Sequence, residues 1–309
     1  MKVISRSADR RSGGRPGAAT MPRPGVAWAV PGLVFFSAFA LVPMVAVAYL
    51  SMTKWRGVGD IDWVGFQNWA NLPDDRFFRN SIWIMLLLLV GTIVIQLPIG
   101  IVLGTWAAGR EKNRAVLSAI YFLPLVSSTA ATATVWKQLM DPNFGIPSQL
   151  KAVFGGTGDF IGTRPGAITM LLVVGAWHYV PFHTLIFQGA VRSIPEVLYQ
   201  AAEVDGAGRF RQFFHVTLPQ LKQTIITSLI FMVVGGLTAF DTVLILTNGG
   251  PGRDTMITPL LMYFTAFREY KFGLAAVMAV ILIAVAAAIS IVLTRLSRYD
   301  RMDSAREGI

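Results

Sequence analysis

The chain has 309 residues, of which 54% are hydrophobic and 14% are charged, and its formal net charge is +10 at pH 7. This composition excludes an ordinary soluble globular protein and indicates a polytopic membrane protein. The sequence contains no cysteine, which excludes disulfides, a thiol nucleophile and a cysteine metal site. The basic residues are spread among loops between apolar stretches and form no patch with stacking aromatics, so no nucleic-acid partner is expected.

The chain begins with a basic segment that differs from everything after it. Residues 1–25 are rich in Gly, Ser and Pro and carry six Lys and Arg residues against one acidic residue, which predicts a disordered cytoplasmic tail. The apolar run at about 26–51 follows. Ala46-Val47-Ala48 within it resembles a signal-peptide cleavage site. However, the run is longer than the about 7–15 residues of a signal-peptide apolar region, so we interpret it as the first membrane span.

Six apolar stretches are long enough to cross a bilayer, which requires about 20 residues of helix. The spans are predicted at about 26–51, 81–108, 115–136, 166–190, 223–246 and 272–293. Residues 26–295 are therefore predicted to form one all-α integral membrane domain of six transmembrane helices, followed by a second cytoplasmic tail at 296–309. Pro98, Pro124 and Pro181 interrupt hydrogen bonding within three of the spans and provide places to bend.

The distribution of Lys and Arg predicts the orientation of these spans. If both termini are cytoplasmic, that side holds both tails, the basic loop at 109–114 and the segment at 193–221. It then carries most of the 27 basic residues, as the positive-inside rule requires. We therefore expect six spans with both ends in the cytoplasm.

Residues 193–221 form a short amphipathic segment among the apolar spans. Ser193 and Glu196 have the spacing of a capping box and Pro195 suits a first helical turn, so a helix is predicted to begin at Ser193. Apolar residues at helical spacing give it one apolar face. Gly206 would end it after about a dozen residues, roughly 18 Å, which is too short to cross a membrane. The segment could lie on the membrane surface or dock a soluble partner.

The order of residues in this segment resembles a known family. Gln200-Ala201-Ala202 is followed by Gly206 and then by Phe213, Val216, Leu218 and Pro219. This pattern resembles the EAA loop of the permease subunits of binding-protein-dependent ABC importers, with Gln200 in place of the leading Glu. The resemblance implies a cytoplasmic coupling helix between spans four and five that contacts an ATPase. The residues implied in coupling are Gln200, Ala201, Ala202, Glu203, Asp205, Gly206, Phe213, Val216, Leu218 and Pro219.

A second motif follows the fifth span. It reads Leu246-Thr247-Asn248-Gly249-Gly250-Pro251, and Thr255 comes shortly after it. The part Asn-Gly-Gly-Pro alone is a turn that ends a helix, but the whole motif is more specific. It resembles the signature loop of the first sugar-permease type of carbohydrate ABC importers, the type found in maltose and glycerol-3-phosphate systems. Segments 65–69 and 141–145 also resemble that family, so the resemblance covers nearly all of the chain beyond residue 26. The signature-loop residues are Leu246, Thr247, Asn248, Gly249, Gly250 and Pro251.

Polar and aromatic residues within the spans are candidates for a substrate pathway. By default such hydroxyls bond to helical carbonyls or neighbouring helices, and such aromatics pack in the core. Aromatic faces with hydroxyl and amide neighbours also suit a sugar ring. The candidates are Ser127, Trp177, Tyr179, His183, Thr238, Phe240 and Asp241. Asp241 is the only acidic residue within a predicted span, where it is either a satisfied structural group or part of the pathway.

The sequence offers neither a metal site nor an energy source. His178 and His183 are five residues apart, so they do not share a helical face as an i, i+4 metal pair would. The chain contains no G-x-x-x-x-G-K-[ST] motif, so it is predicted not to be an enzyme, and ATP and Mg would be bound by a partner ATPase. An ion-coupled carrier would usually place paired carboxylates, or a carboxylate with a His, at membrane depth. The predicted spans hold only one acidic residue, Asp241, so paired carboxylates are not available.

The resemblance implies a permease subunit of an ATP-driven importer for a carbohydrate or a related polyol phosphate, in the inner membrane of a bacterial or archaeal cell. It would form half of the translocation pathway. The implied partners are a second permease subunit, two copies of an ATP-binding subunit, an extracytoplasmic substrate-binding protein and membrane lipid. The alternative is a stand-alone secondary transporter or channel. A membrane enzyme is disfavoured because no nucleophile, base and acid lie in reach of each other.

Overall fold

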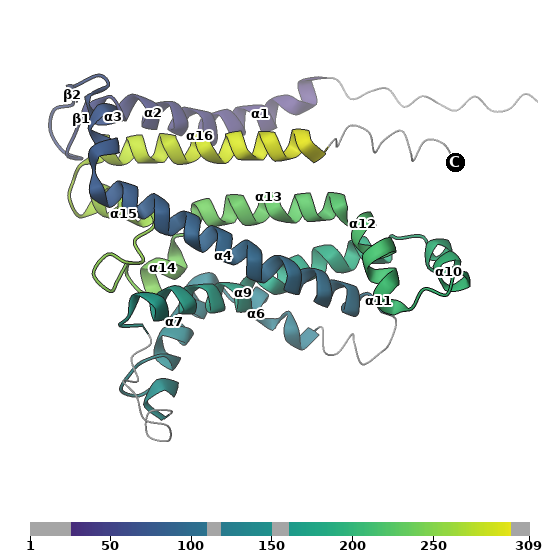
Figure 1. Cartoon of the computed structure of the whole chain (residues 1–309). Helices are drawn as coiled ribbons and strands as arrows, with labels where there is room; N and C mark the ends of the chain where they lie inside the picture. The colour runs from purple at the N-terminus through teal and green to yellow at the C-terminus, as the bar shows by residue number, and fades with distance from the viewer. Residues whose placement is uncertain (1–25, 110–118, 150–160, 298–309) are drawn as a thin grey trace, which may run out of the picture. The chain divides into compact units, whose positions relative to one another are not determined.

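The computed structural model describes residues 26–109, 119–149 and 161–297, and these residues are mostly helical (Figure 1). The tail predicted at 1–25 and most of the loop at 109–114 lie outside the described residues. Of the tail predicted at 296–309, only residues 296–297 are described, and they form the end of a helix. The chain divides into two units, one up to Val45 and one from Ala46 onward. An all-helical fold was predicted, and the helical content confirms it apart from one short strand pair.

The first unit is a continuous apolar helical segment. It consists of η1 (Val26–Ala29), α1 (Val30–Phe36), the π-helical turn η2 (Ser37–Leu41) and the beginning of α2 (Val42–Leu50). No side chain of α1 or α2 is buried, and the stretch Val30–Leu50 is long and apolar enough to cross a membrane. These features agree with the first predicted span.

The second unit begins with a folded connection between α2 and α4. Strands β1 (Thr53–Lys54) and β2 (Asp62–Trp63) pair antiparallel, and α3 (Gln67–Asn71) and η3 (Leu72–Asp74) follow. The Asn68 side-chain amide donates hydrogen bonds to the Ser51 and Thr53 carbonyls at 3.0 and 2.8 Å. The connection between the first two predicted spans therefore has defined secondary structure.

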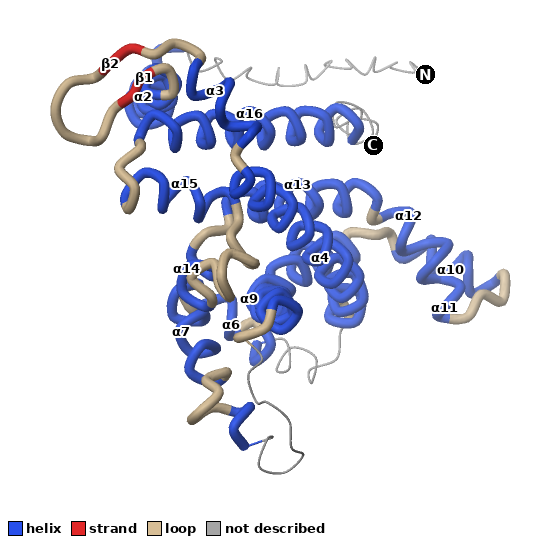
Figure 2. Tube along the Cα trace, turned by 60° about the vertical axis from the view of Figure 1, so that its left-hand side comes forward, coloured by secondary structure: helices blue, strands red, loops and turns tan. Residues whose placement is uncertain are grey.

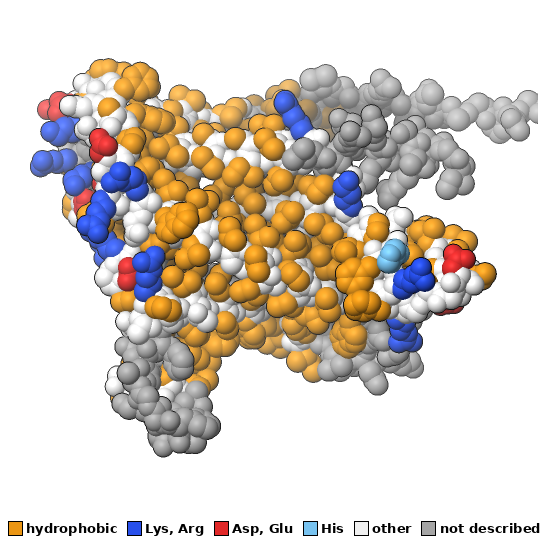
Figure 3. All heavy atoms as spheres, in the orientation of Figure 1, with side chains coloured by type: hydrophobic (Ala, Val, Ile, Leu, Met, Phe, Trp, Pro, Cys, Tyr) orange, Lys and Arg blue, Asp and Glu red, His pale blue; other side chains and the backbone are white. Residues whose placement is uncertain are grey.

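The core of the second unit is built from long helices packed side by side (Figures 1 and 2). Its main helices are α4 (Arg76–Ala107), α9 (Arg164–Arg192), α13 (Lys222–Thr238), α15 (Thr258–Phe267) and α16 (Phe272–Ser297). They bury one apolar cluster that includes Ile84, Val174, Leu237, Leu260 and Met278. Many apolar side chains remain on the outside of these helices, as the space-filling view shows (Figure 3), which is expected of a surface that faces lipid.

The third predicted span, 115–136, is not one helix in its described part. Helix α6 (Leu123–Val126) ends at Ser127 and α7 (Thr129–Leu139) begins after Ser128. Both serines have extended backbone, and the Ser128 hydroxyl accepts a hydrogen bond from the Ala131 N–H at 3.2 Å. Ser128 is thus an N-cap. The hydroxyls therefore interrupt this span.

The fifth predicted span, 223–246, is also broken. Helix α13 ends at Thr238, the chain is extended at Ala239, and the short helix α14 (Asp241–Leu246) follows. Gly235 and Gly236 have low helix propensity, and the Thr238 hydroxyl bonds back to the Val234 carbonyl at 2.9 Å, which weakens a helix end. The boundary predicted at 246 therefore belongs to a second, separate helix.

Within the described residues, four helical stretches are long and apolar enough to cross a membrane: Val30–Leu50, α4, α9 and Phe272–Arg295. A bent pair, Arg209–Gln220 with α13, would add a fifth if its 67° bend lies within one span. The described helices thus agree with a multi-span protein, and the count of six remains a prediction.

Candidate functional site

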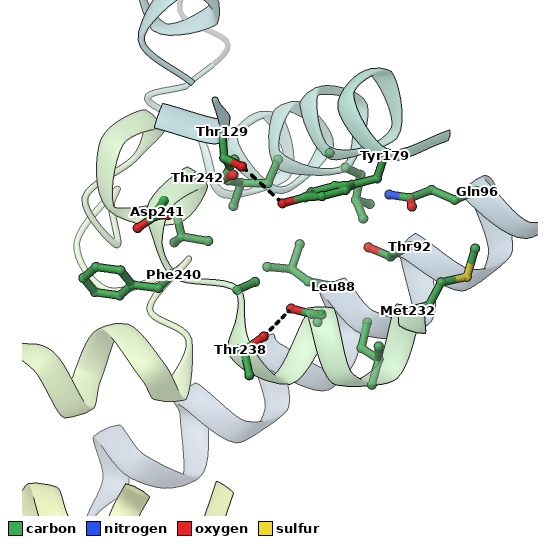
Figure 4. A pocket seen from close by; sticks show the side chains of 18 of the residues that line it. Leu88, Thr92, Gln96, Thr129, Tyr179, Met232, Thr238, Phe240, Asp241 and Thr242 are labelled. Carbon is green, nitrogen blue, oxygen red and sulfur yellow. Dashed lines mark hydrogen bonds between the residues drawn. The ribbon is translucent and has the colours of Figure 1, made fainter. Parts of the chain in front are cut away.

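A cavity of about 400 Å³ lies beside the break between α13 and α14 (Figure 4). Its walls come from α4, α9, α13 and α14, with Leu125 from α6 and Thr129 from α7. Most of the lining is apolar. The polar side chains in the lining are Thr92, Gln96, Thr129, Tyr179, His183, Thr238, Asp241 and Thr242.

Five of the seven candidates for a substrate pathway line this cavity. They are Tyr179, His183, Thr238, Phe240 and Asp241. The other two do not line it. The Ser127 hydroxyl donates to the Pro124 carbonyl at 2.8 Å, and the Trp177 ring is 44% exposed and lies edge-on to the Trp136 ring, with centroids 5.7 Å apart. Both make the contacts expected of a structural role, and their place in a substrate pathway stays a prediction.

The side chain of Tyr179 reaches across the cavity toward α7 (Figure 4). Its hydroxyl is 3.4 Å from the Thr129 Oγ1, which is also 3.5 Å from Nε2 of His178. Nδ1 of His178 is 3.2 Å from the Thr132 Oγ1. His178 therefore ties α9 to α7 and is a structural residue.

His183 links α9 to α13 in a similar way. Its Nδ1 is 2.8 Å from the Ser228 Oγ, and both side chains are buried. Among the described residues, no group of three or more His, Cys, Asp or Glu side chains could hold a metal ion.

Sequence reasoning missed two of the polar lining residues on α4. Gln96 is only 3% exposed, and its side-chain amide makes no hydrogen bond within the described part of the chain. Thr92 lies one turn earlier on the same face of α4. The signal was available, because a Gln with a Thr four residues before it interrupts an apolar span, where polar side chains are costly.

The signature loop after α14 is folded around one buried threonine. The Thr255 hydroxyl donates to the Gly250 carbonyl at 2.7 Å and is 2.8 Å from the Thr247 Oγ1. Asn248 and Gly249 have positive φ values of 51° and 84°, as this turn requires. Leu246 is buried, and Pro251 follows the turn. The loop therefore has a structural role, in joining α14 to α15.

A short helix lies in the segment where the coupling helix was predicted, but it starts later than expected. Helix α10 covers Glu196–Val204, with Pro195 at its N-cap and no side-chain cap. The predicted capping box is wrong, because the Ser193 hydroxyl donates to the Ala190 carbonyl at 2.7 Å and so caps the end of α9. A serine can satisfy a free carbonyl at one helix end as well as a free N–H at the next.

Gly206 ends α10 as predicted. Its φ is +73°, its N–H donates to the Glu203 carbonyl at 2.9 Å, and the Ala207 N–H donates to the Ala202 carbonyl at 2.8 Å. These two bonds form a Schellman motif, in which glycine adopts the left-handed conformation at no steric cost.

No residue of α10 is buried, and the helix extends beyond the ends of α4 and α13 in both ribbon views (Figures 1 and 2). Val197 is 63% and Val204 89% exposed. A hydrogen bond between the Tyr199 hydroxyl and the Thr217 Oγ1, at 2.9 Å, joins α10 to the helical turn η4 (Phe213–Thr217). The exposed residues of the predicted coupling set are Gln200, Ala201, Glu203, Asp205, Gly206 and Pro219, and the half-buried ones are Ala202, Phe213, Val216 and Leu218.

Three curated proteins illustrate the similarity of this chain to known transport proteins. The diacetylchitobiose uptake system permease protein NgcF of Streptomyces coelicolor is 30% identical over 297 residues, covering 89% of this chain and 83% of the relative. The multiple sugar-binding transport system permease protein MsmF of Streptococcus mutans is 32% identical, covering 86% and 92%. The trehalose/maltose transport system permease protein MalF of Thermococcus litoralis is 26% identical, covering 88% and 92%.

A solved structure has the same fold. The crystal structure of a bacterial alginate ABC transporter in complex with an alginate pentasaccharide-bound periplasmic protein contains a chain with a TM-score of 0.78 and 20% identity, covering 89% of this chain and 94% of that one. The family described as the inner membrane component of binding-protein-dependent transport systems matches residues 8–299. The resemblance found in the sequence is thereby confirmed, and the chain belongs to this family of inner membrane components.

Proposed function

We propose that this chain is a permease subunit of an ATP-driven importer for a carbohydrate and forms half of the translocation pathway. The observation that carries this proposal is the cavity beside the α13–α14 break. Its hydroxyl, amide and aromatic side chains are the groups that bind a sugar ring. The names of three relatives, which refer to diacetylchitobiose, multiple sugars and trehalose/maltose, support the same substrate class.

Helix α10 is the proposed contact with the ATPase. None of its residues is buried, and it presents apolar side chains such as Val197 and Val204 to solvent, as expected for a helix whose partner is a separate subunit. The Schellman motif at Gly206 gives it a defined end. ATP and Mg would be bound by two copies of the partner, whose closure would move α10 and rock the spans between inward-open and outward-open forms.

The remaining partners proposed are a second permease subunit, which would supply the other half of the pathway, and an extracytoplasmic substrate-binding protein. Six spans with both termini in the cytoplasm would put α10 on the ATPase side and the signature loop on the other. The alginate transporter was crystallised in complex with a periplasmic protein, which supports such an assembly for this chain.

Reconstitution tests this function directly. The tagged chain is expected to co-purify with a second permease and an ATPase, and the complex in proteoliposomes should take up a neutral oligosaccharide when ATP and the binding protein are supplied. We would begin with diacetylchitobiose and maltose. An ATPase variant that lacks its nucleotide-binding lysine is the control and should show no uptake. Uptake by the isolated chain with an ion gradient would instead support a stand-alone secondary transporter.

A further inference from the structure

The cavity contains one formal charge among its described lining residues, the carboxylate of Asp241. Asp241 is the first residue of α14 and lies directly after the two non-helical residues that separate α14 from α13, Ala239 and Phe240. No Lys or Arg belongs to the lining, and Asp241 makes no ion pair or hydrogen bond within the described residues. Its charge is therefore not neutralised by a partner in the described part of this chain.

The rest of the polar lining is neutral in form and offers both donors and acceptors. Gln96 and Thr92 approach from α4, and Tyr179 and Thr129 from α9 and α7 (Figure 4). Besides Asp241, the titratable side chains of the described lining are Tyr179 and His183. Nδ1 of His183 lies within hydrogen-bonding distance of the Ser228 hydroxyl. These groups match the hydroxyls of an uncharged sugar, which both donate and accept.

We infer that Asp241 determines the charge selectivity of the cavity, so that an uncharged sugar is admitted and anionic sugars such as uronates and sugar phosphates are excluded. This inference rests on the proposed function and narrows its substrate class. The carboxylate accepts hydrogen bonds from sugar hydroxyls. It repels a second negative charge, and this repulsion is stronger beside the mostly apolar walls of the cavity than in bulk water because the effective dielectric constant is lower.

The absence of cysteine from the sequence allows a test that requires no knowledge of the substrate. Thr92→Cys places a thiol on α4, on a different helix from Asp241 and on the wall of the same cavity. In the assembled complex, with cysteine-free partners, the rates of reaction with a cationic and an anionic methanethiosulfonate reagent are compared. Val58→Cys, at an 88% exposed position in the β1–β2 connection, provides the reference ratio of rates.

We expect the cationic reagent to be favoured at Thr92→Cys by about fivefold over the reference, as a single carboxylate nearby would produce. Adding Asp241→Asn should abolish most of this preference and leave the ratio at Val58→Cys unchanged. An unchanged ratio at Thr92→Cys in the Asp241→Asn background would overturn the inference, and so would a thiol at Thr92→Cys that neither reagent reaches.

The two proposals fail in different ways. If the complex transports no sugar, the proposed function fails whatever the ratio of rates is. If ATP-driven uptake of a neutral sugar is observed but the ratio of rates does not depend on Asp241, the proposed function holds and only the inference on charge selectivity fails. Measuring uptake and labelling on the same preparation separates these results.

Discussion

Gly104 lies on α4 where the backbone of α9 approaches it closely. A Cβ added there would come within 2.5 Å of the Phe187 Cβ and 3.0 Å of the Thr184 backbone carbonyl. Backbone cannot move aside as a flexible side-chain end can, so the contact excludes any larger residue. Gly100, one turn earlier, is less crowded: an added Cβ there would lie 3.1 Å from the His183 Cβ and 3.6 Å from the Phe187 ring.

Gly104→Ala is therefore expected to destabilise the packing of α4 on α9. Overpacking of this kind costs about 1–3 kcal/mol, and the thermal unfolding midpoint of the purified complex should fall. Gly189→Ala on α9 is the matched control, because nothing lies within 4 Å of the added Cβ, and it should leave the midpoint unchanged or raise it. Equal midpoints for the two variants would contradict the close approach.

At the level of single residues, the sequence was a better guide to which polar side chains line the cavity than to the local backbone geometry. Tyr179, Thr238 and Asp241 were recognisable because a polar side chain is energetically costly within an apolar span and therefore usually has a specific role. Ser193 was misassigned because a hydroxyl between two helices suits either helix end, and only the three-dimensional positions of the free backbone groups decide which end it caps. Trp177 was proposed on composition, although its ring faces Trp136.

At the scale of elements, hydropathy located the apolar stretches but could not detect the breaks within them. An apolar window has the same mean hydropathy whether it is one helix or two. Each break depends on the backbone of only two residues, Ser127 and Ser128 after α6 and Ala239 and Phe240 after α13. The long helices α4 and α9 were predicted to within about five residues at each end, since their apolar runs end in charged or polar residues.

Helix α10 gives the prediction that belongs to this scale. Ala201 is exposed on α10, so Ala201→Arg should leave the fold of this subunit intact while placing a long charged side chain in the proposed contact with the ATPase. ATP-driven uptake is expected to fall at least about tenfold, because burying an unpaired charge costs several kcal/mol. ATPase activity of the complex would then no longer depend on the binding protein.

Gln200→Glu is the control for that variant. It restores the carboxylate of the family pattern at an adjacent exposed position, and we expect little change in coupled ATPase activity because Glu203 already supplies a carboxylate one turn away. Normal coupled uptake by the Ala201→Arg complex would rule out α10 as the contact. Gly206 is a poor site for such a test, since its φ of +73° strains any other residue.

For the whole molecule, family membership and helical class could be read from the sequence, but the number of spans could not be settled by length and hydropathy. Within the described residues, two of the six predicted spans are composed of shorter helices. Whether such pieces cross the membrane depends on how they pack against the other helices, and pattern alone does not encode that packing.

The topology can be measured with the same cysteine-free background. With six spans and cytoplasmic ends, Val58→Cys should react with a membrane-impermeant maleimide in intact spheroplasts. Gly208→Cys should react only after the membrane is permeabilised. The Gly208 backbone has ordinary φ and nothing lies within 4 Å of an added Cβ, so the variant should fold normally. Labelling of both positions from the same side would contradict the predicted arrangement.

The break between α13 and α14 has a consequence for how strongly the cavity can hold anything. The interruption exposes carbonyls at the end of α13 and N–H groups at the start of α14, and Thr238 through Val243 all lie along the cavity wall. Such backbone is tolerated within a membrane where it lines a space filled with water. An arriving sugar therefore exchanges its own hydration and that of the cavity for similar hydrogen bonds, which yields little net free energy. Weak binding of this kind suits a site within a translocation pathway, because the substrate must leave the site again.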